Sequence, residues 1–202
     1  MDNSLPYKTI TREQFLFHEM RITARLLVEG HSDKEVVKRI KENNLFQFPT
    51  ERMVGNIASV CIRRLKSLDS RELVELIAEG SASTAKQVCL YAMMTSNRLV
   101  WEFMITVIAD KFKTKDFFYS RRDLNAFFTR LQEQEDEVAD WSEETIKKCK
   151  SVLNRILVET EYLETTRAES LNPVLIDQNF KIILMEKRDR AGLAAFNCFE
   201  EV

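Results

Sequence analysis

Residues 43–103 read NNLFQFPTERMVGNIASVCIRRLKSLDSRELVELIAEGSASTAKQVCLYAMMTSNRLVWEF, and this stretch decides the fold class. It contains a series of amphipathic helical patterns, each preceded by a residue that can cap a helix. After Thr50, apolar residues recur at spacings of three and four, the period of an α-helix: Val54, Ile57, Cys61, Leu65 and Leu68. Asp69 with Glu72 marks the next start, and Gly80 lies where that helix should end. The stretch therefore predicts consecutive helices.

Start signals of the same kind occur outside this stretch. Capping residues precede three more apolar runs: Thr11 with Gln14, Ser32 with Glu35, and Ser142 with Thr145. The chain of 202 residues holds only four glycines and three prolines, so little interrupts helix formation. We expect helices near residues 11–29, 33–43, 50–67, 70–79, 83–112, 121–134, 142–160 and 177–197, with Asn97 bending the fifth. The predicted fold class is all-α, a compact multi-helix bundle with a helix-turn-helix-like N-terminal part.

Only residues 162–176, YLETTRAESLNPVLI, favour strand, and a short β wing is an option there. The acidic run from Glu133 to Glu144 holds seven carboxylates and no Lys or Arg, which makes it the best candidate for a boundary between helical lobes. We expect a single helical domain over residues 1–202, with subregions at 1–115 and 116–202 as its N-terminal and C-terminal lobes.

The sequence carries no sign of export or membrane insertion. The first residues, MDNSLPYKTI, lack an apolar signal core, and the most apolar stretch, 99–109, is shorter than a span of roughly 20 residues. The four cysteines are scattered and are typical of reduced, buried side chains. With no CxxC pair and only His18 and His31, we expect no metal site and no cofactor. The chain is predicted to be cytoplasmic, with no membrane contact.

A charge asymmetry underlies the formal net charge of -2. Residues 1–66 hold twelve Lys or Arg against eight Asp or Glu. A polar stripe lies opposite the apolar stripe that follows Thr50, and it consists of Arg52, Asn56, Ser59, Arg63 and Lys66. Two lysines of the preceding helix, Lys38 and Lys41, lie beside it. A helix can enter a major groove, where Arg, Asn and Ser contact bases or phosphate oxygens. This stripe is the first DNA-binding candidate, and an ordinary solvated helix face is the alternative.

A second basic helix competes with the first. It begins at Ser142 and carries four cationic residues: Lys147, Lys148, Lys150 and Arg155. Residues 162–176 could supply a wing beside it. The acidic run just upstream would repel phosphate at the same edge, so this alternative DNA-binding site ranks below the stripe of Arg52.

Three other patterns have a functional and a structural interpretation. The acidic run offers oxygen ligands that suit magnesium, but such runs are usually solvated loops. Six aromatic residues between 112 and 128 alternate with Lys and Arg, a pattern that can bind single strands by stacking, but packing between two lobes explains them more simply. Arg64 and Arg98 lie nearer to apolar helix faces, which favours structural roles for both.

A series of short motifs follows in order along residues 10–165. Its members are Asn44-Leu45, Arg63-Arg64-Leu65, Leu68-Asp69, Leu90-Tyr91-Ala92-Met93, Asn97-Arg98-Leu99 and Glu102-Phe103, with weaker ones at Phe127-Phe128, Trp141-Ser142 and Ile156-Leu157. This series resembles the BrxA family of the bacteriophage exclusion (BREX) defence systems. The resemblance implies a small, all-helical cytoplasmic protein encoded among defence genes that include a DNA methyltransferase.

Members of that family are described as binding double-stranded DNA, their helical body is similar to the antitermination factor NusB, and they are not known as enzymes. The resemblance names no DNA-contacting residues. Together with the basic stripe, it predicts a non-catalytic component of a phage-defence system that binds double-stranded DNA mainly through the phosphate backbone. We expect a monomer with other BREX proteins as partners. The alternative is a protein-interaction scaffold for defence proteins that does not bind DNA.

Overall fold

The computed structural model describes residues 6–11 and 14–199, and over these residues the fold is all-α, as the sequence predicts. They form two compact units. One unit consists of Phe15–Ser96, and the other combines residues up to Gln14 with residues from Asn97 onward. The expectation of a single domain with lobes at 1–115 and 116–202 stays a prediction. None of the helices in the described ranges is long and apolar enough to cross a membrane.

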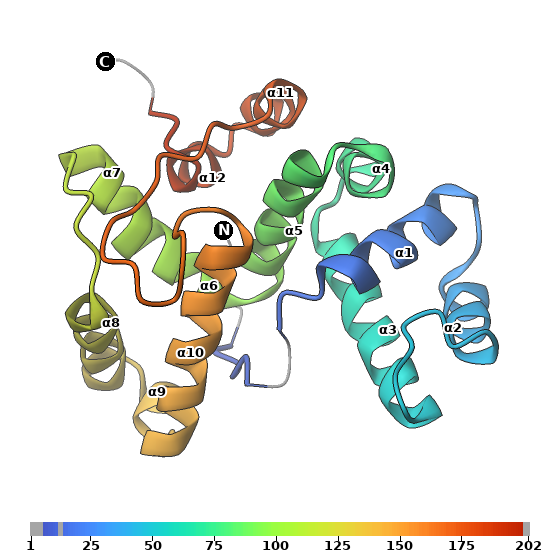
Figure 1. Ribbon diagram of the computed structural model, residues 1–202, viewed down its shortest axis with the longest axis horizontal. Helices are drawn as coiled ribbons and strands as arrows, with labels where there is room; N and C mark the ends of the chain where they lie inside the picture. The colour runs from blue at the N-terminus through green and yellow to red at the C-terminus, as the bar shows by residue number, and fades with distance from the viewer. Residues whose placement is uncertain (1–5, 12–13, 200–202) are drawn as a thin grey trace. The chain divides into compact units, whose positions relative to one another are not determined.

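The first unit packs five helices around a shared apolar core (Figure 1). Helix α1 packs against α3 and α4, α2 packs against α3, and α5 packs against α3 and α4. The core is drawn from every one of these helices, for example Met20, Ile40 and Leu65. The helices have these bounds: α1 Phe17–Val28, α2 Asp33–Glu42, α3 Glu51–Ser67, α4 Arg71–Glu79 and α5 Ala82–Ser96.

Local capping chemistry explains most helix starts in this unit. Ser32 and Glu35 form the predicted capping box: Glu35 Oε2 accepts from the Ser32 backbone N–H at 2.8 Å, and Ser32 Oγ accepts from Glu35 N–H. Thr50 caps α3 by accepting from the Met53 N–H at 3.3 Å. The predicted start at Asp69 is one residue early. Asp69 has a left-handed backbone, and Ser70 is the cap of α4.

The predicted start of the first helix at Thr11 is wrong. Helix α1 begins at Phe17, and Leu16 before it has a left-handed backbone with φ 56° and makes no side-chain cap bond. The Phe15 carbonyl accepts a hydrogen bond at 3.3 Å from the buried Arg64 guanidinium. A helix that started at Thr11 would use the Phe15 carbonyl for its own backbone hydrogen bonds. In the structure this carbonyl accepts from Arg64, which is 49 positions away in sequence.

The second unit is also helical (Figure 1). The predicted helix over 83–112 does not merely bend at Asn97. Asn97 adopts an extended backbone, and its side chain accepts from the Val100 N–H at 3.3 Å, so it caps a new helix. The predicted helix 177–197 is likewise interrupted between Glu186 and Arg190. The elements are α6 Arg98–Phe103, the π-helix η1 Met104–Ala109, α7 Asp110–Thr114, α8 Arg121–Gln134, α9 Asp136–Ala139, α10 Glu143–Glu159, α11 Gln178–Glu186 and α12 Arg190–Ala195.

Residues 162–176 form no strand, so the β wing considered for them is wrong. One isolated antiparallel bridge joins Ser170 to Phe118. Two backbone hydrogen bonds flank it, from Tyr119 N–H to the Glu169 carbonyl at 2.9 Å and from Leu171 N–H to the Phe117 carbonyl at 2.8 Å. The segment instead ties the loop before α8 to the rest of its unit.

Candidate nucleic-acid interface

The predicted polar stripe of α3 forms one continuous exposed face. Its five residues, which we call the α3 stripe, are all exposed: Arg52, Asn56, Ser59, Arg63 and Lys66. On α2, Lys38 is exposed and Lys41 is half-buried. Ser59 Oγ donates to the Gly55 carbonyl of its own helix at 2.9 Å, so its hydroxyl proton is already engaged. The structure thus brings the predicted residues together on the solvent side of α2 and α3, which are joined by residues 43–50, a longer connection than the turn of about 3–4 residues in a helix-turn-helix.

Carboxylates partly neutralise this surface. Lys41 Nζ lies 2.8 Å from Glu51 Oε1, and Lys66 is paired with Asp33. The hydrogen bond from Lys41 and its charge lower the pKa of Glu51, which keeps that carboxylate ionised. Lys38 lies 3.8 Å from Glu42 one turn along α2. Arg52 makes no ion pair within the described part of the chain. The sequence does not reveal these pairings, because Lys41 and Glu51 lie on different helices.

Two arginines set aside as structural residues are indeed structural. Arg64 is 2% exposed and holds the Phe15 carbonyl. Arg98 donates to Glu102 at 2.9 Å and to Glu135 at 2.7 Å. Its guanidinium carbon also lies 4.2 Å from the centre of the Tyr7 ring, a cation–π geometry. The acidic run therefore supplies an internal partner to Arg98.

A second carboxylate of the acidic run also has an internal partner. Glu137 Oε2 accepts from the backbone N–H of Tyr7 at 2.8 Å, and the Tyr7 hydroxyl donates to Glu102 at 2.6 Å. Burial and the hydrogen bond to Glu102 raise the pKa of Tyr7 well above its ordinary value. Within the described ranges, no group of three or more His, Cys, Asp or Glu is arranged to hold a metal ion. The run anchors the N-terminal segment of its unit.

The alternative basic helix lies beside a groove. Lys147, Lys150 and Arg155 of α10 line a hollow of about 900 Å³ together with residues of α8 and residues 166–167. Lys148 does not line it and lies 3.5 Å from Glu144. An adjoining hollow of about 590 Å³ shares four lining residues with the first, so the two form one continuous groove. The shared residues are Arg121, Asn154, Thr166 and Arg167.

The groove contains two arginines that the sequence places in the interleaved basic and aromatic pattern, and a third that the sequence assigned to no site. Arg121 and Arg122 begin α8, and Arg167 lies in the segment first interpreted as a wing. Arg121 and Arg122 stand out in the sequence as basic residues that follow Phe117 and Phe118. Arg167 could not be predicted, because long-range contacts bring its segment to this edge: the bridge between Ser170 and Phe118 and the hydrogen bond from Asn154 to the Thr166 carbonyl.

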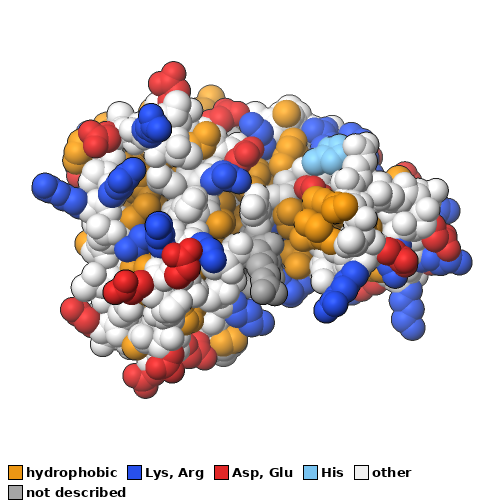
Figure 2. All heavy atoms as spheres, turned by 60° about the horizontal axis from the view of Figure 1, so that its bottom comes forward, with side chains coloured by type: hydrophobic (Ala, Val, Ile, Leu, Met, Phe, Trp, Pro, Cys, Tyr) orange, Lys and Arg blue, Asp and Glu red, His pale blue; other side chains and the backbone are white. Residues whose placement is uncertain are grey.

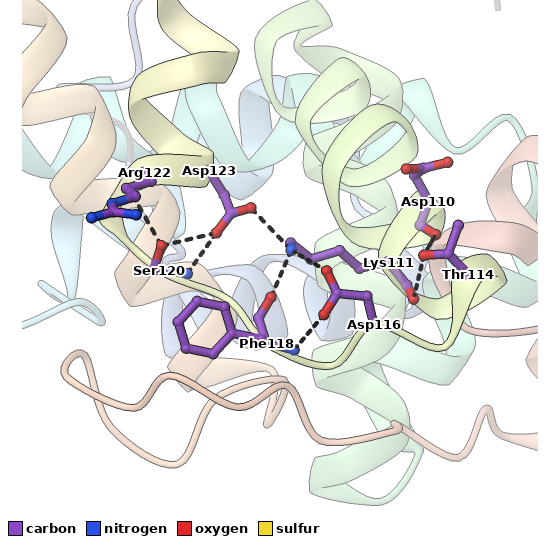
Figure 3. A network of polar contacts seen from close by, with 8 residues as sticks. All are labelled: Asp110, Lys111, Thr114, Asp116, Phe118, Ser120, Arg122 and Asp123. Atoms are coloured by element: carbon purple, nitrogen blue, oxygen red, sulfur yellow. Dashed lines mark hydrogen bonds and ion pairs between the residues drawn. The ribbon is translucent and has the colours of Figure 1, made fainter.

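A half-buried lysine organises the loop at one end of the groove (Figure 3). Lys111, only 12% exposed, donates to Asp123 at 2.9 Å, to Asp116 at 3.1 Å and to the Phe118 carbonyl at 2.6 Å. Burial by itself would lower the pKa of Lys111, but the two carboxylates outweigh it and raise the pKa. The charged ammonium thus joins α7, the loop and α8.

Most aromatic residues between 112 and 128 are packed, which confirms the structural interpretation for them. Phe112, Tyr119, Phe127 and Phe128 are buried. The phenylalanines that precede Tyr119 in the loop behave differently: Phe117 is 40% exposed and Phe118 is 56% exposed. Of these two, only Phe118 lines the groove.

Acidic side chains are interspersed among the basic ones. In Figure 2, blue Lys and Arg side chains alternate with red Asp and Glu, and no large area of one sign covers that view. Polyanion binding by this chain would therefore depend on particular unpaired cations rather than on a uniform basic face.

These features define the chain as an all-α protein of two helical units that carries localised basic surfaces and, among the described residues, no assembled metal-binding cluster. The family model BrxA matches residues 6–188, and the chain belongs to the BrxA family of the BREX phage-defence systems. The resemblance inferred from the ordered motifs is confirmed.

Three relatives illustrate the range of similarity. The BREX protein BrxA of Bacillus cereus (strain H3081.97) is 37% identical over 159 residues, 79% of each chain. The BREX protein BrxA of Escherichia coli O9:H4 (strain HS) is 27% identical over 161 residues, 78% of this chain and 74% of that protein. A crystal structure of a protein from Magnetospirillum magneticum shares the fold, with a TM-score of 0.80 and 23% identity over 94% of this chain and 97% of that one.

Proposed function

We propose that this chain is a cytoplasmic, non-catalytic component of a BREX system that binds double-stranded DNA through the α3 stripe. Membership of the BrxA family is the reason for assigning the chain to a BREX system. The observation that carries the proposal is the exposure of all five stripe residues along one helix, which follows α2 in a helix-turn-helix-like arrangement.

The geometry suits a helix lying against a duplex. Helix α3 has 17 residues, so it is about 25 Å long at 1.5 Å per residue. Arg52 and Asn56 lie near its N-terminus, the end whose free backbone N–H groups favour phosphate. Glu51 at the same end would repel phosphate, but Lys41 neutralises it. Contacts of this kind act mainly on the backbone and position a protein without reading much sequence.

A mobility-shift titration of a duplex tests the stripe. We expect the variant Arg52→Glu/Arg63→Glu/Lys66→Glu to lose at least about 100-fold in duplex affinity, because binding through several phosphates is steeply charge-dependent. A control that makes the same change in net charge elsewhere is Arg71→Glu/Lys113→Glu/Lys115→Glu, and it should keep the affinity within about threefold. Equal affinity of the stripe variant and the wild type would reject this surface.

Other BREX proteins are the partners that this proposal implies. DNA and protein contacts can be separated by recovering the tagged protein from cells with and without nuclease treatment. We expect defence proteins that co-purify through DNA to be lost after nuclease digestion. Sustained metal-dependent cleavage of DNA by the pure protein would contradict the non-catalytic part of the proposal.

A protein-interaction scaffold is the second candidate, and exposed apolar residues near the C-terminus favour it. Leu175 is 89% exposed, Met185 55% and Ile182 43%. Large apolar side chains at such exposure often mark surfaces that bind protein. Under this alternative, the defence proteins stay bound after nuclease treatment, and the substitution Met185→Glu releases them while the stripe variant does not.

A further inference from the structure

The groove between α8, α10 and residues 166–169 differs from an ordinary solvated surface in its charge. Six cationic residues line it against two carboxylates, Glu143 and Glu169. None of the six makes an ion pair in the described part of the chain, and only Lys150 and Arg155 have a side-chain hydrogen bond, each to a neutral amide. Unpaired cations gathered around a concave surface concentrate positive potential there, which attracts an anionic ligand.

The walls of the groove are held together by specific hydrogen bonds. Asn154 on α10 accepts from the Tyr119 hydroxyl at 3.1 Å and donates to the Thr166 carbonyl at 3.1 Å, so one side chain joins three segments. Lys150 donates to Asn125 of α8 at 2.8 Å and lies 5.4 Å from the Phe128 ring centre. The groove is therefore formed before any ligand arrives, which lowers the entropic cost of binding.

An exposed aromatic ring lies at one end of this groove. The Phe118 backbone is fixed by three contacts. Its carbonyl accepts from Lys111 and its N–H donates to Asp116 at 3.1 Å (Figure 3), and it also forms the bridge to Ser170. Its side chain nevertheless remains 56% exposed. Packing does not explain an exposed phenylalanine on so well-anchored a backbone. Among the lining residues, it offers a flat apolar face next to Arg121 and Arg167.

We propose that this groove binds a single-stranded nucleic acid, with a base stacked on Phe118 and the phosphates lying along Arg121, Arg122, Arg167 and Lys147. Aromatic faces combined with a basic groove are the usual means of binding single strands, because every base has a face that can stack. In a duplex the base faces are already stacked on one another and cannot reach Phe118. The proposal does not depend on duplex binding by the α3 stripe.

The experiment measures affinity by fluorescence anisotropy with labelled oligo-dT and oligo-rU of about 15 nucleotides, a length that matches typical single-strand sites. Wild-type protein should bind at least one of them. Phe118→Ala should weaken that binding about tenfold, and Phe118→Trp should restore it. Phe117→Ala is the matched control, since Phe117 is the neighbouring exposed phenylalanine but does not line the groove, and it should leave the affinity unchanged.

A charge variant gives an independent readout. Arg121→Glu/Arg167→Glu should reduce single-strand affinity at least about 100-fold, while binding of a duplex of equal length stays within about threefold of wild type. The four substituted residues are all exposed: Phe117, Phe118, Arg121 and Arg167. The variants should therefore fold like the wild type, and thermal melting checks this. A preference for oligo-dT or oligo-rU identifies the natural strand, and either supports the proposal. No binding of either oligonucleotide by wild type, full affinity in Phe118→Ala, or equal loss of duplex and single-strand binding in the charge variant would overturn it.

Discussion

The α3 stripe and the groove in the second unit carry similar residues but differ in how their charges are balanced. Near the stripe, Lys41 and Lys66 are paired with Glu51 and Asp33. In the groove, Arg121 and Arg167 make no ion pair among the described residues, and two carboxylates of the acidic run, Glu135 and Glu137, are engaged elsewhere by Arg98 and the Tyr7 N–H. The number of cations on a helix therefore does not give its local charge, because carboxylates on neighbouring helices neutralise some of those cations.

The largest expected effect on stability comes from removing the lysine that organises the groove. Lys111→Met leaves Asp116 and Asp123 side by side without a cation, which should lower the free energy of unfolding by about 2 kcal/mol and the melting temperature by roughly 5 °C. The affinity of Lys111→Met for single-stranded nucleic acid should also fall, whereas its affinity for duplex DNA should stay unchanged. Lys113→Met, an exposed lysine on the same helix, is the control. A melting temperature equal to wild type would show that the network in Figure 3 is not needed for stability.

Substitutions that should strengthen duplex binding test the role of the carboxylates near the α3 stripe. Glu51→Gln/Asp33→Asn removes the carboxylates that neutralise Lys41 and Lys66, so duplex affinity should rise about tenfold, a change of about 1.4 kcal/mol. The measurement is the same mobility shift, repeated at several salt concentrations, and the salt dependence should become steeper. The control Glu143→Gln/Glu169→Gln lies at the groove and should leave duplex affinity as it is. If the α3 variant also leaves it unchanged, the stripe does not contact phosphate.

Two neighbouring lysines of α10 provide a finer test. Lys147 lines the groove, whereas Lys148 lies outside it and pairs with Glu144. Lys147→Gln should lower single-strand affinity about threefold, and Lys148→Gln should have no effect, because only the first removes a cation from the path of the strand. Anisotropy titrations of both variants at one salt concentration measure the difference. Equal losses would mean that overall charge, and not the groove, controls binding.

The smallest expected effect concerns acid stability. Burial opposes ionisation of Asp123, but hydrogen bonds from Lys111 and the Ser120 backbone outweigh it and hold the pKa of Asp123 below its ordinary value of about 3.9. A depressed folded-state pKa stabilises the fold above the unfolded pKa, and this contribution disappears as the pH falls through the folded pKa. The wild type should therefore melt above Asp123→Asn at pH 7, and the gap should close below about pH 4. A gap that stays constant with pH would contradict the ion pair.

Local signals in the sequence predict much of this fold. Thr50 and Ser32 cap the helices that they were expected to cap, since a cap needs only residues within one turn. The failures involve contacts between distant residues. The helix predicted to start at Thr11 begins only at Phe17, after Phe15, whose carbonyl accepts from the distant Arg64. The strand-like residues 162–176 form only one bridge, since Tyr162, Leu163 and Leu171 are buried by packing within their own unit rather than by pairing in a sheet, and Leu175 remains exposed.

In the candidate sites, too, features set by local sequence could be predicted, and features set by contacts between distant residues could not. The exposed stripe of α3 could be predicted because helical periodicity alone places Arg52, Asn56 and Arg63 on one face. The neutralisation of the stripe's charge could not be predicted, because Lys66 pairs with Asp33, which lies 33 positions away in sequence. The groove required the packing of three segments, and Arg167 enters it from a segment whose sequence pattern favoured a different structure.

Reciprocal binding of matched ligands tests the central claim, that the two surfaces take different nucleic acids. Affinities for a duplex and for a single strand of the same sequence are measured for the stripe variant, Arg52→Glu/Arg63→Glu/Lys66→Glu, and for the groove variant, Arg121→Glu/Arg167→Glu. The account predicts a crossover, with the stripe variant losing at least about 100-fold for the duplex alone and the groove variant losing as much for the single strand alone. Parallel losses of both ligands in either variant would contradict it.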